Sequence, residues 1–381
     1  MKIDYFVIYT LALPMRFSVS HSLARRKTAN NILVQAVAEN GRSGWGESCP
    51  RPYVTGETVE TAASDLKIHI LPPLIGVGFE TFEQATDYLS AITPHLPRSR
   101  YAAFCAAELA VLDLAGKTFE ASAGAVVGPI ARRHVNYGSV IASSEPAAVR
   151  KLAVMMRIFG FRHIKVKVQH SLEQNVKVLA NARKVLGKRI VLRIDANGAW
   201  SADEALRQIK RLARFDLEAV EQPVAGDDID GMAAVTAARL LPVVADESLC
   251  TLDDAQTIVD RRAADVVNIR ISKCGGLINS TRILRFALQH GLGCQVGAQV
   301  GETAILSAAG RHLATRCPAL LWCEGSYGSL LLRRDIAPGM TMGYGGRAAA
   351  LQMPGLGAEP DMDRISQFAA DATEVRSYAA V

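Results

Sequence analysis

The chain lacks the patterns that mark several common protein classes. Its seven cysteines are an odd number without Cys-x-x-Cys spacing, which suggests neither a disulfide framework nor a zinc site. No apolar run reaches the roughly 18 residues that a membrane span requires, and we see no targeting segment at the N-terminus. We therefore expect a cytoplasmic protein that does not bind a membrane.

The chain also lacks a strongly basic stretch and a histidine paired with an acid. The net charge of +6 comes from scattered lysines and arginines, with only short pairs such as Arg25-Arg26. This pattern does not indicate nucleic-acid binding, but it is compatible with attraction of a small-molecule carboxylate substrate. None of the eight histidines lies at an expected strand end beside a partner acid, so a His-Asp dyad is not evident.

What the chain does contain is a repeated pattern of apolar runs that end in charge. Lys165 and Lys167 alternate within a β-branched run, so a strand would direct both ammonium groups to one face. The later runs end, in order, at Asp195, Glu221, Asp246 and Arg270. From Lys167 onward the steps are 28, 26, 25 and 24 residues by subtraction, about one strand, one helix and two short loops each.

Repeated strand-helix units favour a parallel sheet, and their near-constant period favours closure into a barrel. A chain of 381 residues with 49% hydrophobic content is long enough for one barrel of roughly 200–250 residues and a second domain. Barrel enzymes carry their chemistry at the C-terminal ends of the strands. The charged residues should therefore converge at one mouth.

Three convergent carboxylates, from Asp195, Glu221 and Asp246, are the oxygen ligands of a hard cation such as Mg²⁺, with Mn²⁺ as an alternative. Open positions on such a metal imply a bound anion. Lys165, Lys167 and the metal should lower one another's proton affinity and bring a lysine pKa toward neutrality. The set predicts proton abstraction next to a carboxylate, with Mg²⁺ holding the enediolate.

Four motifs in this order carry a family resemblance. They are Lys-Val-Lys at 165–167, Asp-Ala-Asn at 195–197, Glu-Gln-Pro at 221–223 and Asp-Glu-Ser at 246–248. The sequence resembles the muconate-lactonizing-enzyme subgroup of the enolase superfamily over nearly its whole length. The resemblance implies an α/β fold, a modified TIM barrel (β/α)7β with an α+β capping domain. It also implies metal binding by the three acids, Lys167 as acid/base, and Lys165 and Asn197 as supporting residues.

By this likeness residues 1–130 form the capping domain, 131–335 the barrel, and 336–381 a segment that returns to the capping domain. Alternation and periodicity predict capping strands near 6–13 and 32–39, helices near 57–69, 81–91 and 100–114, loops over 15–31 and 49–56, and an irregular C-terminal stretch. In the family two such loops choose the substrate. Arg51 and Tyr53 are candidates there, with Arg25, Arg26 and Lys27 as further cations. We also expect a homo-oligomer.

The sequence departs from the family at the sixth strand. Many relatives have a second catalytic lysine there, where this chain has Arg270, with Lys273 three positions later. Arginine can stabilise an enediolate but cannot readily abstract a proton. We expect Lys273 to point away, which leaves Lys167 as the single base. The alternative is that Lys273 reaches back across the mouth as a second base.

The seventh and eighth strands depart as well. Near Gln299, a candidate substrate-binding residue, the acid found in cycloisomerases is missing. Glu324, in Cys-Glu-Gly, replaces the Asp-x-Asp with which dipeptide epimerases grip an α-ammonium group. That change argues against dipeptides as substrates. Glu324 either contacts the substrate or pairs with an arginine.

We therefore expect an Mg²⁺-dependent, muconate cycloisomerase-like isomerase or lyase that forms an enediolate from a small carboxylate. The alternatives are a racemase or epimerase of an N-acyl or cyclic amino acid, a dehydratase of a hydroxy acid and, more remotely, a non-catalytic scaffold protein. The presence of Lys165 and Lys167 beside all three carboxylates weighs against the scaffold.

Overall fold

A parallel sheet of eight strands curves into a barrel, in the order β5 to β12 along the chain. The computed structural model describes residues 1–21 and 24–376, with side chains left out for 18–26. The strands are β5 Ser139–Ile141, β6 His163–Lys167, β7 Val191–Asp195, β8 Leu217–Glu221, β9 Val243–Ala245, β10 Val266–Ile269, β11 Gly293–Val296 and β12 Leu320–Cys323. The Gly138 N–H donates to the Cys323 carbonyl oxygen over 2.8 Å, which joins the first strand to the last.

One helix follows each of the first seven barrel strands, so the predicted (β/α)7β fold is confirmed. These helices are α4 Pro146–Ile158, α5 Leu172–Leu186, α6 Ala202–Leu212, α7 Ile229–Ala237, α8 Leu252–Arg261, α9 Leu277–Gln289 and α10 Ala304–Arg316. Local signals start several of them: Ser171 and Ser201 accept backbone N–H groups at the N-termini of α5 and α6. Thr251 and Asp254 form a capping box at α8.

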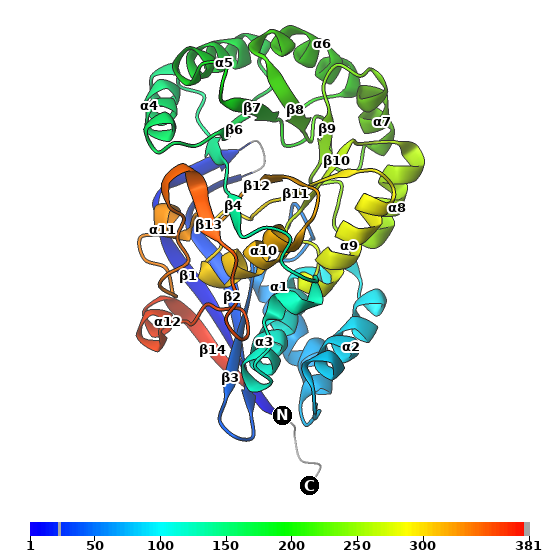
Figure 1. Ribbon diagram of the computed structural model, residues 1–381, viewed down its shortest axis with the longest axis vertical. Helices are drawn as coiled ribbons and strands as arrows, with labels where there is room; N and C mark the ends of the chain where they lie inside the picture. Colours follow the sequence, from blue (N-terminus) through cyan, green and yellow to red (C-terminus); the bar gives the residue numbers. More distant parts are fainter. Residues whose placement is uncertain (22–23, 377–381) are drawn as a thin grey trace.

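A second domain lies against the barrel (Figure 1). Its antiparallel sheet has the order β14-β1-β2-β3. The elements are β1 Ile3–His21, β2 Ala24–Ala38, β3 Ser43–Ser48, β14 Ala369–Arg376, α1 Val59–Asp65, α2 Phe82–Ile92 and α3 Tyr101–Thr118. The alanine-rich helix α3 is buried along nearly its whole length. A Cβ atom at Gly46 would collide with the Ala106 carbonyl oxygen, so glycine there lets β3 and α3 approach closely.

One expectation for a loop is wrong. Residues 15–31 belong largely to strands, because β1 and β2 stay paired past Leu13 and Ala29 as far as His21 and Ala24. The side chains of Arg25 and Arg26 lie outside the described ones. The C-terminal stretch is irregular over most of 333–361, as expected, apart from β13 Arg347–Ala349, which pairs with β4 His134–Asn136. It then returns to the capping domain, where α12 spans Met362–Phe368 and β14 pairs with β1. The remaining short helix, α11, spans Gly328–Leu331.

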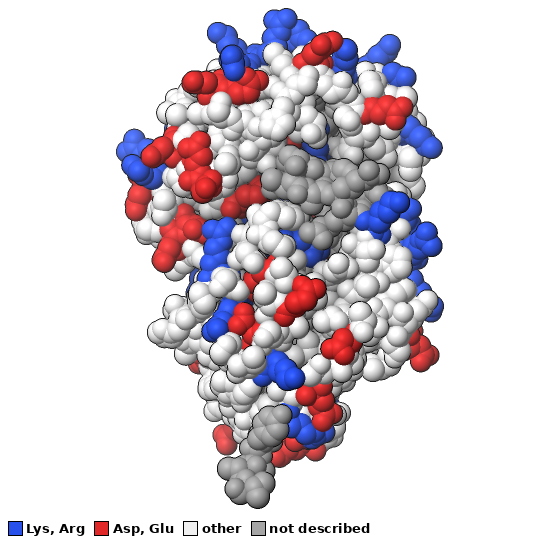
Figure 2. Space-filling model, turned by 180° about the vertical axis from the view of Figure 1, so that it is seen from behind, with Lys and Arg blue, Asp and Glu red and all other residues white. Residues whose placement is uncertain are grey.

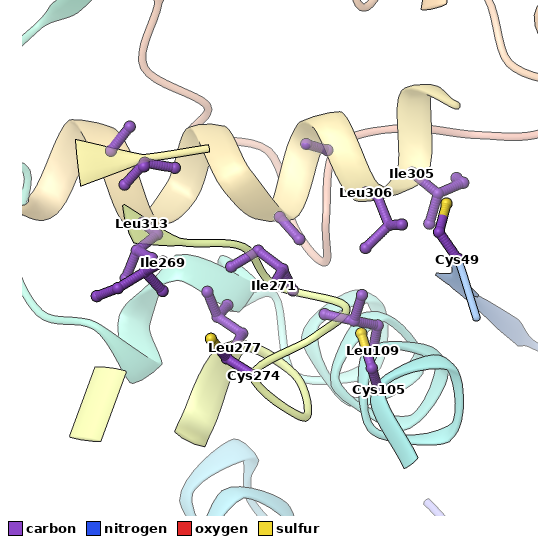
Figure 3. Packing of buried hydrophobic residues seen from close by; sticks show 14 of the residues in the cluster. Cys49, Cys105, Leu109, Ile269, Ile271, Cys274, Leu277, Ile305, Leu306 and Leu313 are labelled. Carbon is purple, nitrogen blue, oxygen red and sulfur yellow. The ribbon is translucent and has the colours of Figure 1, made fainter. Parts of the chain in front are cut away.

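The capping domain contacts the loops that follow β10 and β11, at the C-terminal end of the barrel. Asn31 donates to the Gly301 carbonyl oxygen over 2.8 Å, and the Cys49 N–H donates to the Ser272 hydroxyl over 2.9 Å. Figure 3 shows apolar packing at the same boundary, where Leu109 of α3 and Leu306 of α10 lie near the segment after β10. The capping domain is therefore seated over the mouth where the charged strand ends meet.

One face of the surface is mixed in charge. Figure 2 shows lysine and arginine interspersed with aspartate and glutamate on the face opposite to that of Figure 1. Within residues 1–21 and 24–376, no helix is both long and apolar enough to cross a membrane. All seven cysteines are buried as free thiols.

Candidate active site

The three predicted metal ligands lie side by side at the barrel mouth. Asp195 ends β7 and Glu221 ends β8, and the two pair in register across these strands. Asp246 directly follows β9. Each of the three residues is 1% exposed. Parallel strands end at the same edge of a sheet, which is why carboxylates spaced by one strand-helix unit come together here.

Both lysines of β6 point into this group, as their alternation predicts. Lys165 Nζ lies 2.8 Å from Glu221 Oε1, 2.7 Å from Glu324 Oε2 and 3.6 Å from Asp195 Oδ2. Burial alone would lower the pKa of Lys165, but these three carboxylates outweigh burial and raise it. The three carboxylates thus hold Lys165 as an ammonium ion. The predicted lowering of a lysine pKa depends on a bound metal and stays a prediction.

Lys167 occupies the outer position of the same strand face. Its Nζ lies 2.6 Å from Asn197 Oδ1 and 3.3 Å from Asp195 Oδ2. Asn197 has a left-handed backbone with φ of 46°, and its Nδ2 donates to Glu247 Oε1 over 3.1 Å. Asn197 thus links the Lys167 ammonium group to a second acid of the Asp-Glu-Ser motif.

Two cations reach Asp246 from the side of β10. The Arg270 Nη2 group contacts Asp246 Oδ2 closely and lies 3.8 Å from Glu221 Oε1. Lys273 Nζ lies 2.8 Å from Asp246 Oδ1 and also donates to the Asp246 backbone carbonyl oxygen. The expectation that Lys273 points away is wrong. Burial lowers the pKa of Lys273.

The turn after β10 explains the direction of Lys273. The Cys274 N–H donates to the Arg270 carbonyl oxygen over 3.0 Å, so the chain folds back on itself at once. Gly276 has a φ of 105°, and a Cβ atom there would collide with the Glu108 carboxylate of α3. Ile271 and Cys274 pack into the apolar cluster of Figure 3. The turn therefore directs Lys273 toward Asp246.

Beneath these three carboxylates lies a buried charge that sequence reasoning missed. Arg193 of β7 lies 2.8 Å from Glu324 Oε1, bonds closely to Gln295 and stacks over the Trp322 ring at 4.4 Å. The signal was present, because Arg193 alternates with Asp195 on one strand face and must point into the barrel. Of the two roles weighed for Glu324, the structure supports pairing with an arginine.

The donor set fits a hard divalent cation. Asp195, Glu221 and Asp246 offer only oxygen atoms, as Mg²⁺ prefers. Among the described residues no three His, Cys, Asp or Glu side chains already form a metal cage, because ammonium and guanidinium groups lie between the carboxylates. These cations neutralise the charge that a metal would otherwise balance. The three acids could hold the metal once a cation gives way.

The remaining substrate-binding candidates fall in different places. Arg51 is 1% exposed and donates to the carbonyl oxygens of Asn30, Pro50 and Val300, so the expectation that it reads a substrate anion is wrong. Gln299 accepts from Arg270 Nη1 over 3.3 Å. Tyr53 lines a cavity of about 310 Å³, together with Arg98 of the capping domain and with Asn197, Gly226, Asp227 and Glu247 of the barrel loops.

Two family profiles match the chain. The profile described as "Enolase C-terminal domain-like" matches residues 148–364, and "Mandelate racemase / muconate lactonizing enzyme, N-terminal domain" matches residues 5–128. The fold and the mouth define an enolase-superfamily enzyme. The chain belongs to the mandelate racemase / muconate lactonizing enzyme family.

Similar proteins extend over nearly the full chain. N-succinyl-L-Arg/Lys racemase of Bacillus cereus is 28% identical over 370 residues, 97% of this chain and 98% of that protein, and its crystal structure matches with a TM-score of 0.90. A dipeptide epimerase from Cytophaga hutchinsonii, complexed with Mg and D-Ala-L-Val, matches with a TM-score of 0.90 at 25% identity, over 99% and 100% of the two chains. Muconate cycloisomerase 1 of Rhodococcus opacus is 28% identical over 88% of this chain and 90% of that protein.

Proposed function

We propose that the protein is an Mg²⁺-dependent racemase or epimerase that moves a proton at the carbon next to the carboxylate of an N-acylated amino acid. One observation carries the proposal: Lys167 on β6 and Lys273 after β10 approach the three carboxylates from opposite ends of their row. Lys167 lies 3.3 Å from Asp195, and Lys273 lies 2.8 Å from Asp246. Inversion at a carbon needs one group to remove a proton and another to return it on the opposite face.

Each lysine has a distinct part in this scheme. Lys167 and Lys273 exchange protons with the two faces of the substrate carbon, and the lowered pKa of buried Lys273 suits a base. Lys165, whose pKa is raised, stays protonated and holds Glu221 and Glu324 in place. Bound Mg²⁺ would supply positive charge to the substrate carboxylate as the neighbouring proton leaves.

Glu324 supports an N-acylated substrate over a dipeptide. Its two oxygens are engaged by Lys165 at 2.7 Å and Arg193 at 2.8 Å, so the carboxylate is already neutralised by two cations. A dipeptide presents an α-ammonium group that needs a free anion. An acylated nitrogen carries no charge and makes no such demand. The racemase of N-succinyl amino acids among the similar proteins agrees with this choice.

A second candidate, a one-base cycloisomerase or other lyase, rests on Arg270. Of the two cations that follow β10, Arg270 has the more accessible side chain: it is 12% exposed, whereas the Lys273 side chain is 0% exposed. An arginine at this place can stabilise negative charge on the substrate but does not abstract a proton. Lys167 would then act on one face alone.

Proton exchange in D₂O separates the two candidates. Wild type, Lys167→Ala and Lys273→Ala would be incubated with Mg²⁺ and both enantiomers of N-succinyl and N-acetyl amino acids, with Lys177→Ala as the control on an exposed pair with Glu173. Exchange would be followed by NMR and configuration by chiral chromatography. For the racemase, each active-site variant should lose racemisation by more than about 100-fold, since general acid-base groups contribute at least that much.

The pattern of exchange identifies the mechanism. In a two-base enzyme, Lys167→Ala loses exchange from one enantiomer and Lys273→Ala from the other. Exchange with retained configuration in wild type, preserved in Lys273→Ala, would overturn the racemase proposal and favour the one-base lyase. A folded, Mg²⁺-loaded protein that exchanges no proton in any carboxylate offered would point to a scaffold protein.

A further inference from the structure

Both oxygens of Asp246 are occupied by cations of the protein itself. Lys273 Nζ lies 2.8 Å from Oδ1, and Arg270 Nη2 contacts Oδ2. Asp246 is 1% exposed, so solvent does not screen these contacts. A cation at an oxygen of a metal ligand takes up one of its lone pairs and repels the ion. A metal would therefore have to compete with these two cations for Asp246.

The mouth contains as many basic as acidic side chains. There are five of each: Lys165, Lys167, Arg193, Arg270 and Lys273 with Asp195, Glu221, Asp246, Glu247 and Glu324. A divalent ion would add two positive charges beside the five basic side chains. Release of a cation from the ligand that it neutralises is the local adjustment that lowers this cost.

We propose that Arg270 is this releasable cation: it holds a carboxylate oxygen of Asp246, competes with the metal for it and so sets the metal affinity. The inference rests on the proposed Mg²⁺-dependent function. It assigns Arg270 a role in loading the site, where the sequence suggested only contact with the substrate.

The contacts of the two cations decide between them. Lys273 is 0% exposed, and the Asp246 backbone carbonyl oxygen holds it in addition to the carboxylate. The Arg270 side chain is 12% exposed, and its one other hydrogen bond within the described residues is to Gln299, at a long 3.3 Å. Its buried Nε atom has no partner there. Arg270 therefore loses fewer interactions than Lys273 on leaving Asp246.

The Arg270 side chain can compete with a metal for two carboxylates at once. The same Nη2 group that contacts Asp246 lies 3.8 Å from Glu221 Oε1, so one guanidinium lies near two of the three ligands. A fixed planar group with several donors can bridge two carboxylates in this way. Its release would free donors beside Gln299, at the mouth where a substrate carboxylate is expected.

Metal titration tests the inference without any activity measurement. The affinities for Mg²⁺ and Mn²⁺ would be measured by calorimetry for wild type, Arg270→Gln and Arg270→Lys. Arg98→Gln is the control, because Arg98 is a cation that lines the mouth cavity but contacts Val54 and Asp254 instead of a metal ligand. Circular dichroism would verify the fold of each variant.

We expect Arg270→Gln to bind metal at least about tenfold more tightly than wild type, because charge-assisted bonds of this kind exceed the free energy of a tenfold change in affinity. Arg98→Gln should bind as wild type does. The thermal midpoint of Arg270→Gln should also rise more on metal addition than that of wild type.

Each other outcome has a defined meaning. Equal or weaker metal binding by Arg270→Gln would overturn this inference and leave the racemase proposal intact. An equal gain in metal affinity in Arg98→Gln would overturn the inference too, since removal of any nearby cation would then have the same effect. If Arg270→Gln does not fold, the test uses Arg270→Lys, which keeps the charge but loses the planar guanidinium group. Tighter metal binding by this variant than by wild type would support the inference. No metal binding by any variant or wild type would overturn the Mg²⁺-dependent function itself.

Discussion

Buried carboxylates occur in two regions of this protein and are held in two different ways. At the barrel mouth, Glu221 faces Lys165 Nζ at 2.8 Å and the guanidinium groups of Arg193 and Arg270 at 3.8 Å. At the boundary with the capping domain, Glu108 accepts from the Ile278 N–H at the start of α9, and Glu47 caps the start of α10. None of these three glutamates is more than 1% exposed.

The same burial has opposite consequences for their protonation. Burial would raise the pKa of Glu221, but the ammonium group of Lys165 and the nearby guanidinium groups lower it to about 2. Burial raises the pKa of Glu47 to about 7 and that of Glu108 to about 8, because the Thr303 hydroxyl and backbone N–H groups at Glu47, and backbone N–H groups at Glu108, offset burial only in part. Full cations keep a buried acid ionised, as a metal ligand has to be. Neutral hydrogen-bond donors leave it with a raised pKa, suited to tie two domains together.

The largest expected effect comes from Glu221→Gln. This change removes one metal ligand and the anion that faces Lys165, so buried cations are left uncompensated. We expect the free energy of unfolding to fall by about 3–5 kcal/mol, as when one partner of a buried pair is removed. Metal-dependent proton exchange should fall by more than about 100-fold, a larger loss than is typical when a residue that only hydrogen-bonds to a metal ligand is changed. Denaturant unfolding and D₂O exchange measure the two effects.

If Glu221→Gln bound metal with wild-type affinity, the contrast between the barrel mouth and the domain boundary would fail, because Glu221 would then not act as a metal ligand. A useful control is Glu173→Gln, an exposed acid of α5 that pairs with Lys177 at 2.7 Å. Exposed pairs of this kind contribute about 0–1 kcal/mol, so this variant should differ little from wild type.

The next effect is a pH dependence that arises at the domain boundary. The pKa of Glu108 is raised from an ordinary 4.5 to about 8, so its contribution to stability is complete below pH 4.5 and is lost as the pH rises toward 8. The slope is about 1.4 kcal/mol per pH unit for one such group. Glu108→Gln should remove this slope. Unfolding free energies of both proteins at pH 5.5 and 8.5 would measure it.

The difference between the two proteins isolates Glu108 from other buried acids. The pKa of Glu302 is likewise raised to about 8, and its contribution cancels in the comparison. If wild type and Glu108→Gln lose stability in parallel between these pH values, Glu108 is ionised throughout and the two regions do not differ as described.

The sequence was sufficient to predict much of the fold and the row of three carboxylates at the barrel mouth. Strand-helix units are local, so steps of 24 to 28 residues identify successive strand ends, and Asp195, Glu221 and Asp246 meet there. The alternation of Lys165 and Lys167 predicts their shared direction, which Lys165 and Lys167 both follow toward Asp195. Periodicity therefore predicts which side chains lie at the mouth.

Partners distant in sequence account for what could not be predicted. The direction of Lys273 depends on a turn in which Gly276 makes room for Glu108 of another domain. Arg51 is taken up by carbonyl oxygens, of which that of Val300 lies 249 positions away. Such contacts leave no periodic trace in the sequence. Charge type alone could not distinguish a substrate-binding arginine from one that holds two loops together.

The smallest expected effect, Glu47→Gln, is the sharpest test of the comparison. Glu47 accepts from the N–H groups of Thr303 and Leu306 and from Asn31, and the side-chain oxygen of glutamine can retain part of this set. With a pKa of about 7, Glu47 is mostly protonated at pH 6, so exchange for a neutral amide should change the unfolding free energy by no more than about 1 kcal/mol. At pH 8.5 wild type has to ionise this buried group, whereas the amide does not, so the variant should gain stability relative to wild type. Glu47→Ala should lose more at both pH values, because it leaves the helix start without its acceptor. A loss in Glu47→Gln at pH 6 as large as that in Glu221→Gln would mean that Glu47 is an ionised anion too, and that hydrogen bonds from peptide groups can do at the boundary what only cations do at the mouth.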